Sequence, residues 1–188
     1  MGIPELLVPA GNLEKLKIAL TYGADAVYVG TSLFGLRKYA PNFTLSELRH
    51  GIEFAHQRNK RVYIVLNSFA HTHTMDTLPD MIDALAALNP DAFIISDRGV
   101  FELARARCSV PLHVSTQASV TNAAGCAYWK AAGAKRIILA REVSIAACTA
   151  ILDHVPIELE IFITGLCVPA IRGNALFPIT QQIGRAHV

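Results

Sequence analysis

The feature that most constrains the fold is a regular alternation of short apolar runs with helix-forming segments along almost the whole chain. Between the apolar runs, Asn12, Thr44 and Ser144 stand where helix N-caps are expected, and Glu47 completes a capping box with Thr44. The runs of strand length lie at residues 6–8, 26–30, 61–67, 92–97, 112–117, 136–140 and 159–163. Seven strands separated by helices predict parallel pairing through right-handed crossovers.

Two α/β architectures are compatible with this alternation, a doubly wound sheet and a closed barrel. In a doubly wound nucleotide-binding sheet, a glycine-rich phosphate loop often follows the first strand. Here the first strand is followed by Pro9-Ala10-Gly11-Asn12 instead. We therefore predict a TIM-type (β/α) barrel over residues 1–163, incomplete at its C-terminus with about seven strands. Without a last strand, the first and seventh strands would have open edges.

Composition favours a protein built on a covered parallel sheet, but it does not indicate a binding partner. Of the 188 residues, 52% are hydrophobic and 17% are charged, which suits a parallel sheet that is covered on both faces. A net charge of +2 neither demands nor excludes a nucleic acid. There is no apolar stretch of about 18 residues, and residues 1–5 lack the basic and apolar regions of a signal peptide. We therefore expect a cytoplasmic protein with no membrane partner.

The four cysteines, Cys108, Cys126, Cys148 and Cys167, are spaced too widely for a CxxC metal motif. In a cytoplasmic protein they are expected to be reduced thiols. The first three lie in segments that are predicted to be helical, and we expect them to be buried.

Barrel active sites form at the C-terminal ends of the strands, and here those ends are polar. One such residue alone is well explained as a helix cap or a turn former, whereas the whole set favours a polar, partly cationic binding site. The pair His71 and His73 has two interpretations, a metal site or a polar loop, and no neighbouring carboxylate or cysteine spacing supports the metal. The candidate residues at the strand ends, in the turns beyond them and within strand five are Asn67, His71, His73, Asp97, His113, Ser115, Gln117, Arg141 and Glu142.

Two segments near the start, PELLVPAG at 4–11 and YGADAVYVG at 22–30, strongly resemble the opening of peptidase family U32, the collagenase-like proteases. The segment ELEIF at 158–162 is similar to the lead into the family's cysteine signature. The resemblance covers about residues 3–162. Further positions that match the family in order and spacing are Asn67, Ser96-Asp97, His113-x-Ser115-x-Gln117 and Arg141-Glu142.

The resemblance implies RNA hydroxylation more than proteolysis, because the opening is most similar to the tRNA-uridine hydroxylation branch of the family. It implies a tRNA or other RNA partner, a small hydroxyl donor such as prephenate, and an iron–sulfur cluster bound by four cysteines. Of those four, Cys167 is the one candidate ligand in this chain. Two alternatives remain open: a collagenase-like peptidase, and a non-catalytic partner in an oxygen-independent hydroxylation complex. Against the peptidase, the sequence has no recognisable nucleophile–base pair.

The chain departs from the family signature after Phe162. Residues 163–175 lack the second cysteine and the Tyr-Ser-Gly of the signature, and a one-base frame slip would restore the signature residues in register. Residues 183–188 resemble translated adapter DNA. We therefore interpret 164–188 as a frame-shifted and adapter-derived tail, and we expect this fragment to be inactive and to assemble no cluster. The nucleotide sequence across codons 160–176 tests the frame slip.

Overall fold

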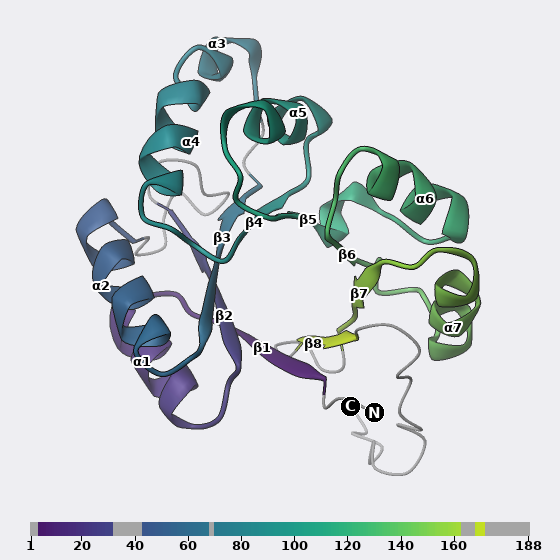
Figure 1. Ribbon diagram of the computed structural model, residues 1–188, viewed down its shortest axis with the longest axis horizontal. Helices are drawn as coiled ribbons and strands as arrows, with labels where there is room; N and C mark the ends of the chain where they lie inside the picture. The colour runs from purple at the N-terminus through teal and green to yellow at the C-terminus, as the bar shows by residue number, and fades with distance from the viewer. Residues whose placement is uncertain (1–3, 32–42, 68–69, 163–167, 172–188) are drawn as a thin grey trace, which may run out of the picture.

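The computed structural model describes residues 4–31, 43–67, 70–162 and 168–171, and its strands form one closed barrel in chain order (Figure 1). The strands are β1 (Glu5–Pro9), β2 (Ala26–Gly30), β3 (Arg61–Leu66), β4 (Ala92–Ile95), β5 (Leu112–Val114), β6 (Arg136–Ile138), β7 (Glu158–Glu160) and β8 (Val168–Ile171). The helices are α1 (Leu13–Thr21), α2 (Leu45–His56), α3 (Thr72–Met75), α4 (Leu78–Ala86), α5 (Arg98–Arg107), the 3₁₀ helix η1 (Thr116–Ala118), α6 (Ala123–Ala131) and α7 (Ile145–His154).

The seven parallel strands that the sequence predicts are confirmed, but the expected open edges are not. Strands β1 to β7 pair in parallel, each with the next. Strand β8 then lies antiparallel to both neighbours, with Ala170 opposite Glu160 of β7 and opposite Glu5 of β1. The edges of β1 and β7 are therefore covered by β8, which lies within the segment that we interpreted as a tail.

Alternation along each strand divides the apolar residues into two cores. In β3, Val62, Ile64 and Leu66 face outward into a large cluster between the strands and the helices. Tyr63 and the partly buried Val65 face inward, into a smaller cluster inside the barrel. Because side chains alternate along a strand, the inward series of β3 begins at Arg61 and runs on to Asn67.

The helices lie around the outside of the strands in chain order (Figure 1). Their N-caps confirm the sequence signals: Asn12 Oδ1 accepts a hydrogen bond from Lys15 N, Ser144 Oγ accepts one from Ala147 N, and Thr44 forms its capping box with Glu47. Within the described residues, no helix has the length and apolar character that a membrane crossing needs.

Several strands end earlier in the structure than the predicted runs, among them β4 at Ile95, β5 at Val114 and β6 at Ile138. The run at 112–117 is strand only as far as Val114, because Ser115 Oγ accepts a hydrogen bond from Gln117 N and turns the chain into η1. Between β3 and β4 the chain forms two helices, α3 and α4, and Pro79 lies in the first turn of α4, where its missing N–H is tolerated.

Candidate functional site

At the mouth, the end of the barrel to which the parallel strands direct their C-termini, Asn67 and Ser115 join two strands that are not neighbours. Asn67 follows β3 and Ser115 follows β5, and the Asn67 Nδ2 group donates to Ser115 Oγ over 2.8 Å. Ser115 is 3% exposed. The other amide atom, Asn67 Oδ1, is buried and has no hydrogen-bond partner among the described residues. A buried acceptor without a donor is costly, so this atom marks a place where a ligand N–H or O–H would be favourable.

Three more predicted residues, Asp97, Gln117 and Glu142, lie exposed at the same end of the barrel. Asp97 Oδ1 accepts a hydrogen bond from Val100 N over 2.9 Å and caps α5. Gln117 lies in η1, and Glu142 lies in the turn after β6. For Asp97 the structural role as a cap is therefore established, while a role in substrate binding stays a prediction for all three.

Arg141 is held differently from the other mouth residues. Its guanidinium Cζ lies 4.7 Å from the centre of the Phe162 ring. Phe162 follows β7 and packs against the inner cluster of the barrel. Phe162 was not among the predicted site residues, although its place two residues after Glu160 continues the inward alternation of β7 and was a usable signal.

The predicted histidines do not lie together. His113 is 4% exposed inside the barrel, where its ring packs edge-on against Tyr63 with 4.9 Å between ring centres. It lies opposite Arg136 in the register of β5 and β6, below Ser115 on the same inward series. His71 is exposed at the start of α3. Its partnership with His73 in a metal pair stays a prediction, and no group of three or more candidate metal ligands occurs in the described parts of the chain.

The opposite end of the barrel holds a charged network that sequence analysis missed, which we call the floor network. Arg136, only 1% exposed, is its centre. Its guanidinium donates to Glu5 over 2.7 Å, to Glu158 over 2.9 Å and to Glu160 over 3.4 Å. The full network comprises Glu5, Arg61, Tyr63, Arg136, Glu158 and Glu160. The available signal was the charged or phenolic side chain at the first or third position of each contributing strand.

Burial and pairing shift the ionisation of the floor carboxyls in opposite directions. Burial raises the pKa of Glu160 to about 8, although the Arg136 charge opposes that shift. Burial also tends to raise the pKa of Glu5, but Arg136, Tyr63 and Arg61 together lower it. Glu5 is thus ionised and Glu160 is mostly protonated at neutral pH. Protonation of Glu160 reduces the negative charge of the floor network, so that it is better balanced by the positive charge of Arg61 and Arg136.

The described cysteines do not fit the iron–sulfur cluster that the family resemblance implies. Cluster iron is bound by thiolates, yet burial raises the pKa of Cys126 to about 11 and that of Cys148 in the same direction. Both are buried on helices, and Cys108 is half-buried at the end of α5. The predicted ligand Cys167 lies outside the described residues.

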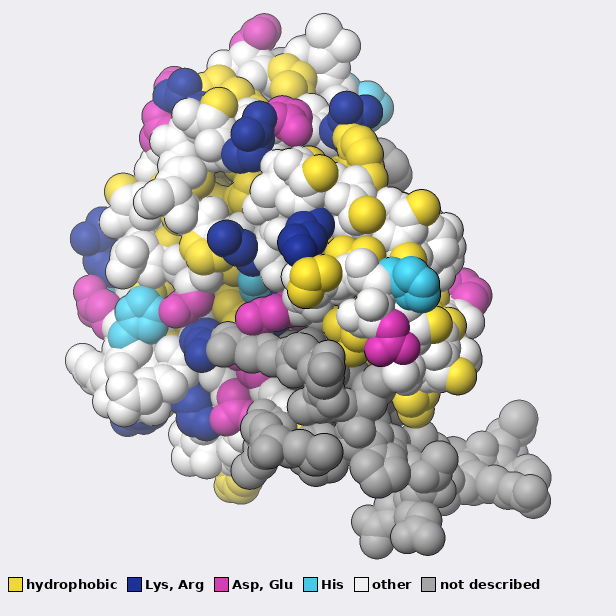
Figure 2. Space-filling model, turned by 45° about the vertical axis from the view of Figure 1, so that its right-hand side comes forward, with side chains coloured by type: hydrophobic (Ala, Val, Ile, Leu, Met, Phe, Trp, Pro, Cys, Tyr) yellow, Lys and Arg dark blue, Asp and Glu magenta, His cyan; other side chains and the backbone are white. Residues whose placement is uncertain are grey.

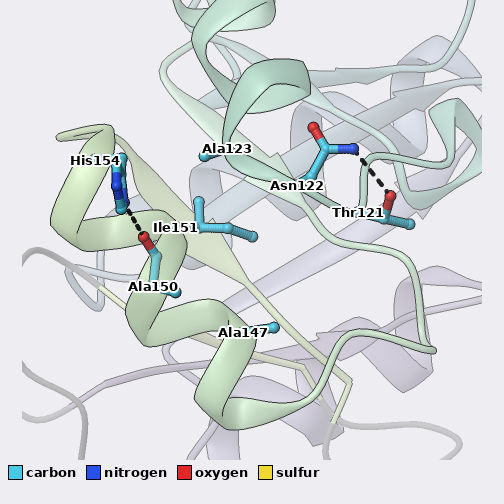
Figure 3. Close-up of a pocket in the computed structure, with 7 residues that line it drawn as sticks. All are labelled: Thr121, Asn122, Ala123, Ala147, Ala150, Ile151 and His154. Atoms are coloured by element: carbon cyan, nitrogen blue, oxygen red, sulfur yellow. Dashed lines mark hydrogen bonds between the residues drawn. The ribbon is translucent and has the colours of Figure 1, made fainter.

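A groove on the outer wall offers little chemistry. It has a volume of about 270 Å³ between the start of α6 and one side of α7 (Figure 3). Its polar groups already have partners within the wall: Asn122 Oδ1 accepts from Gly125 N over 2.9 Å, and His154 Nδ1 donates to the Ala150 carbonyl over 2.7 Å. The rest of the lining is mainly alanine and Ile151. The mouth is the better candidate site.

Charge on the outer wall is mixed. On the face shown in Figure 2, lysine and arginine side chains are interspersed with aspartate and glutamate. On α5, Arg105 pairs with Glu102 and Arg107 pairs with Asp83 of α4. Paired arginines provide little surplus charge for RNA phosphates.

A family model and curated relatives both match most of this chain. The family model described as peptidase family U32 matches residues 11–182. The chain is 46% identical over 185 residues to the tRNA hydroxylation protein P of Helicobacter pylori (strain ATCC 700392 / 26695), covering 97% of this chain and 44% of that protein. It is 43% identical over 174 residues to the tRNA hydroxylation protein P1 of Bacillus subtilis (strain 168), covering 92% of this chain and 41% of that protein.

A solved structure supports the fold. The structure of the U32 peptidase Mk0906 superposes with a TM-score of 0.69 at 18% identity, covering 82% of this chain and 66% of that one. At this identity the likeness shows the fold alone. The chain spans about two fifths of the length of the two tRNA hydroxylation proteins.

Proposed function

Because this chain belongs to peptidase family U32, we propose that it is part of a tRNA hydroxylation protein whose barrel mouth holds the substrates. The substrate would be a wobble uridine, and the hydroxyl donor a small acid such as prephenate. In this proposal the barrel binds and orients the substrates, and a tRNA substrate would place the protein in the cytoplasm. Both curated relatives described above are named for tRNA hydroxylation, which supports the RNA class.

The observation that carries the proposal is the Asn67–Ser115 pair. Sequence-specific recognition of RNA uses splayed-out bases that are hydrogen-bonded on their Watson–Crick edges. The Nδ2 group of Asn67 is committed to Ser115, and this fixes Asn67 Oδ1 as an acceptor without a donor among the described residues. A uracil ring presents an N3–H donor on that edge, whereas cytosine presents an acceptor at the same position. We therefore assign Asn67 as the base-reading residue.

The cluster stays a proposal for the full-length protein. The described cysteines do not fit it, so its thiolate ligands would have to come from outside the described residues. No step of the proposed binding depends on it.

The peptidase alternative finds less support in the described residues. Ser115 Oγ accepts hydrogen bonds from Asn67 Nδ2 and from Gln117 N, so it acts as a cap and an anchor rather than as an activated nucleophile. The raised pKa of the Cys126 thiol disfavours the nucleophilic thiolate.

The test is genetic complementation in a strain that lacks the gene for the full-length protein. Hydroxylated uridine in purified tRNA, measured by mass spectrometry, should disappear on deletion, return with the wild-type gene and stay low with Asn67→Ala. Asn122→Ala, which removes a helix cap on the outer wall, is the control and should restore the modification. Unchanged tRNA after deletion, together with gelatin cleavage by the purified protein, would favour the peptidase instead.

A further inference from the structure

Arg141 differs from the arginines that stabilise the barrel. Four described arginines, Arg61, Arg105, Arg107 and Arg136, form ion pairs with carboxylates. Arg141 forms no ion pair within the described residues, and its contact is the face of the Phe162 ring. A guanidinium that lies over a ring keeps its N–H donors in its own plane, and the side chain of Arg141 is exposed. Its hydrogen-bonding edges are therefore available to a ligand.

Phe162 gives this guanidinium a fixed place. The ring is only partly buried and packs against the inner cluster, at the top of the inward series of β7. Arg141 itself lies in a turn that is closed by a 3.1 Å hydrogen bond from Val143 N to the Ala140 carbonyl. Backbone and ring together limit the positions that the guanidinium can take, which lowers the entropy lost when it binds.

The chemistry that fits this arrangement is an oxyanion. A planar guanidinium with a free edge binds carboxylate or phosphate through two parallel hydrogen bonds. Like Phe162, the partly buried Tyr28 and Val65 pack against the inner cluster. The apolar Phe162 ring next to the guanidinium suits the carbon skeleton of a small acid better than the phosphate of a solvated RNA backbone.

We propose that Arg141, positioned by Phe162, binds the carboxylate of the small acid that donates the hydroxyl group. The identity of the acid rests on the proposed function, whereas the oxyanion site rests on the geometry at the mouth. Arg141 is the binding residue, and Phe162 acts through it as a positioning residue.

The test is calorimetric titration of the full-length protein with prephenate in one arm and a uridine-containing tRNA anticodon stem-loop in the other. Arg141→Ala should weaken prephenate binding roughly 10- to 100-fold, as expected for the loss of a charge-assisted pair, and change stem-loop binding little. Arg141→Lys keeps the charge but loses the planar fork, so it should give an intermediate loss.

Phe162→Leu tests positioning separately from folding. It should weaken prephenate binding about 3- to 10-fold in the wild-type background. In the Arg141→Ala background it should cause no further loss, because a positioning residue acts only through the group that it positions. The matched control is Arg98→Ala, since Arg98 is also exposed and lies over an aromatic ring, Tyr128, at 5.1 Å on the outer wall. That variant should bind prephenate like the wild type.

The outcomes separate the two proposals. If Arg141→Ala weakened only stem-loop binding, the carboxylate assignment would be overturned, and the oxyanion that Arg141 binds would be an RNA phosphate. Unchanged affinities in both arms for Arg141→Ala would overturn the site itself. Binding is measured without turnover, so a protein that binds prephenate through Arg141 but hydroxylates no tRNA would refute the proposed function and leave the site standing.

Discussion

The two ends of the barrel are both polar, but their polar groups are satisfied in different ways. At the floor, Arg136 is almost fully buried and its donors are taken by three glutamate side chains of the same network. At the mouth, Arg141 is exposed and Asn67 Oδ1 has no partner among the described residues. Groups that satisfy one another stabilise the fold, whereas groups with unused donors or acceptors are available to ligands. Substitutions at the floor should therefore change stability, and substitutions at the mouth should change function.

The largest effect is expected from Arg136→Leu at the floor. Removal of the central cation leaves the buried Glu5 carboxylate with Arg61 as its one remaining counter-charge in the network, and loss of one partner of a buried pair costs about 3–5 kcal/mol. The free energy of unfolding from urea denaturation measures the effect. Arg105→Ala on the surface of α5 is the control, because its pair with Glu102 is exposed and contributes little. If both variants lose the same small amount, the floor is not the electrostatic centre of the barrel.

The next effect is a pH dependence due to Glu160. Its pKa in the folded protein is raised from an ordinary value of 4.5 to about 8, so its stabilising contribution is fully present below 4.5 and is lost as the pH rises through about 8. Over this window the wild type should lose stability on the order of a few kcal/mol. Glu160→Gln should flatten the decline, as measured by the melting temperature at a series of pH values.

Two comparisons isolate the contribution of Glu160. Glu5 has the opposite sign, because its pKa is lowered; its contribution is lost only as the pH falls below about 4.5, outside this window. Glu53→Gln, at an exposed position of α2, should leave the decline unchanged. A decline that persists in Glu160→Gln would show that another group titrates in this range.

At the mouth, Ser115→Ala should affect function more than stability. The change removes the acceptor for Asn67 Nδ2 and the cap of η1, which costs about 1 kcal/mol. Because Asn67 would no longer be held in place, tRNA hydroxylation by the full-length protein should fall roughly tenfold or more. Asn122→Ala, a cap of similar strength on α6, should lose similar stability and keep its activity. Equal activity in the two variants would remove Asn67 from the site.

The sequence predicts the order of strands and helices better than it predicts the charged contacts inside the barrel. Apolar runs and N-caps such as Asn12 and Thr44 are local signals, and they located the seven parallel strands but not β8. The end of β5 was missed because a side-chain cap from Ser115 overrides the strand pattern there. The floor was missed for a different reason: Arg136 and Glu5 are 131 residues apart, and only closure of the barrel brings them together. Likewise, the stacking of Arg141 on Phe162 depends on how two strand ends meet.

The smallest effect is expected from Asp97→Asn, which tests whether every polar residue at the mouth serves a ligand. Asp97 Oδ1 caps α5, and a Cβ added at Gly99 would lie 3.2 Å from that oxygen, so the cap is closely packed. Asparagine caps as well as aspartate does, so stability should change by less than about 0.5 kcal/mol, whereas Asp97→Ala should lose about 1 kcal/mol. We expect Asp97→Asn to keep full tRNA hydroxylation, because this carboxylate, like those of the floor, already has its partner. A fall in hydroxylation with unchanged stability would instead show that the negative charge of Asp97 acts on a substrate. Asp97 would then, like Arg141, be a mouth residue whose substitution changes function rather than stability.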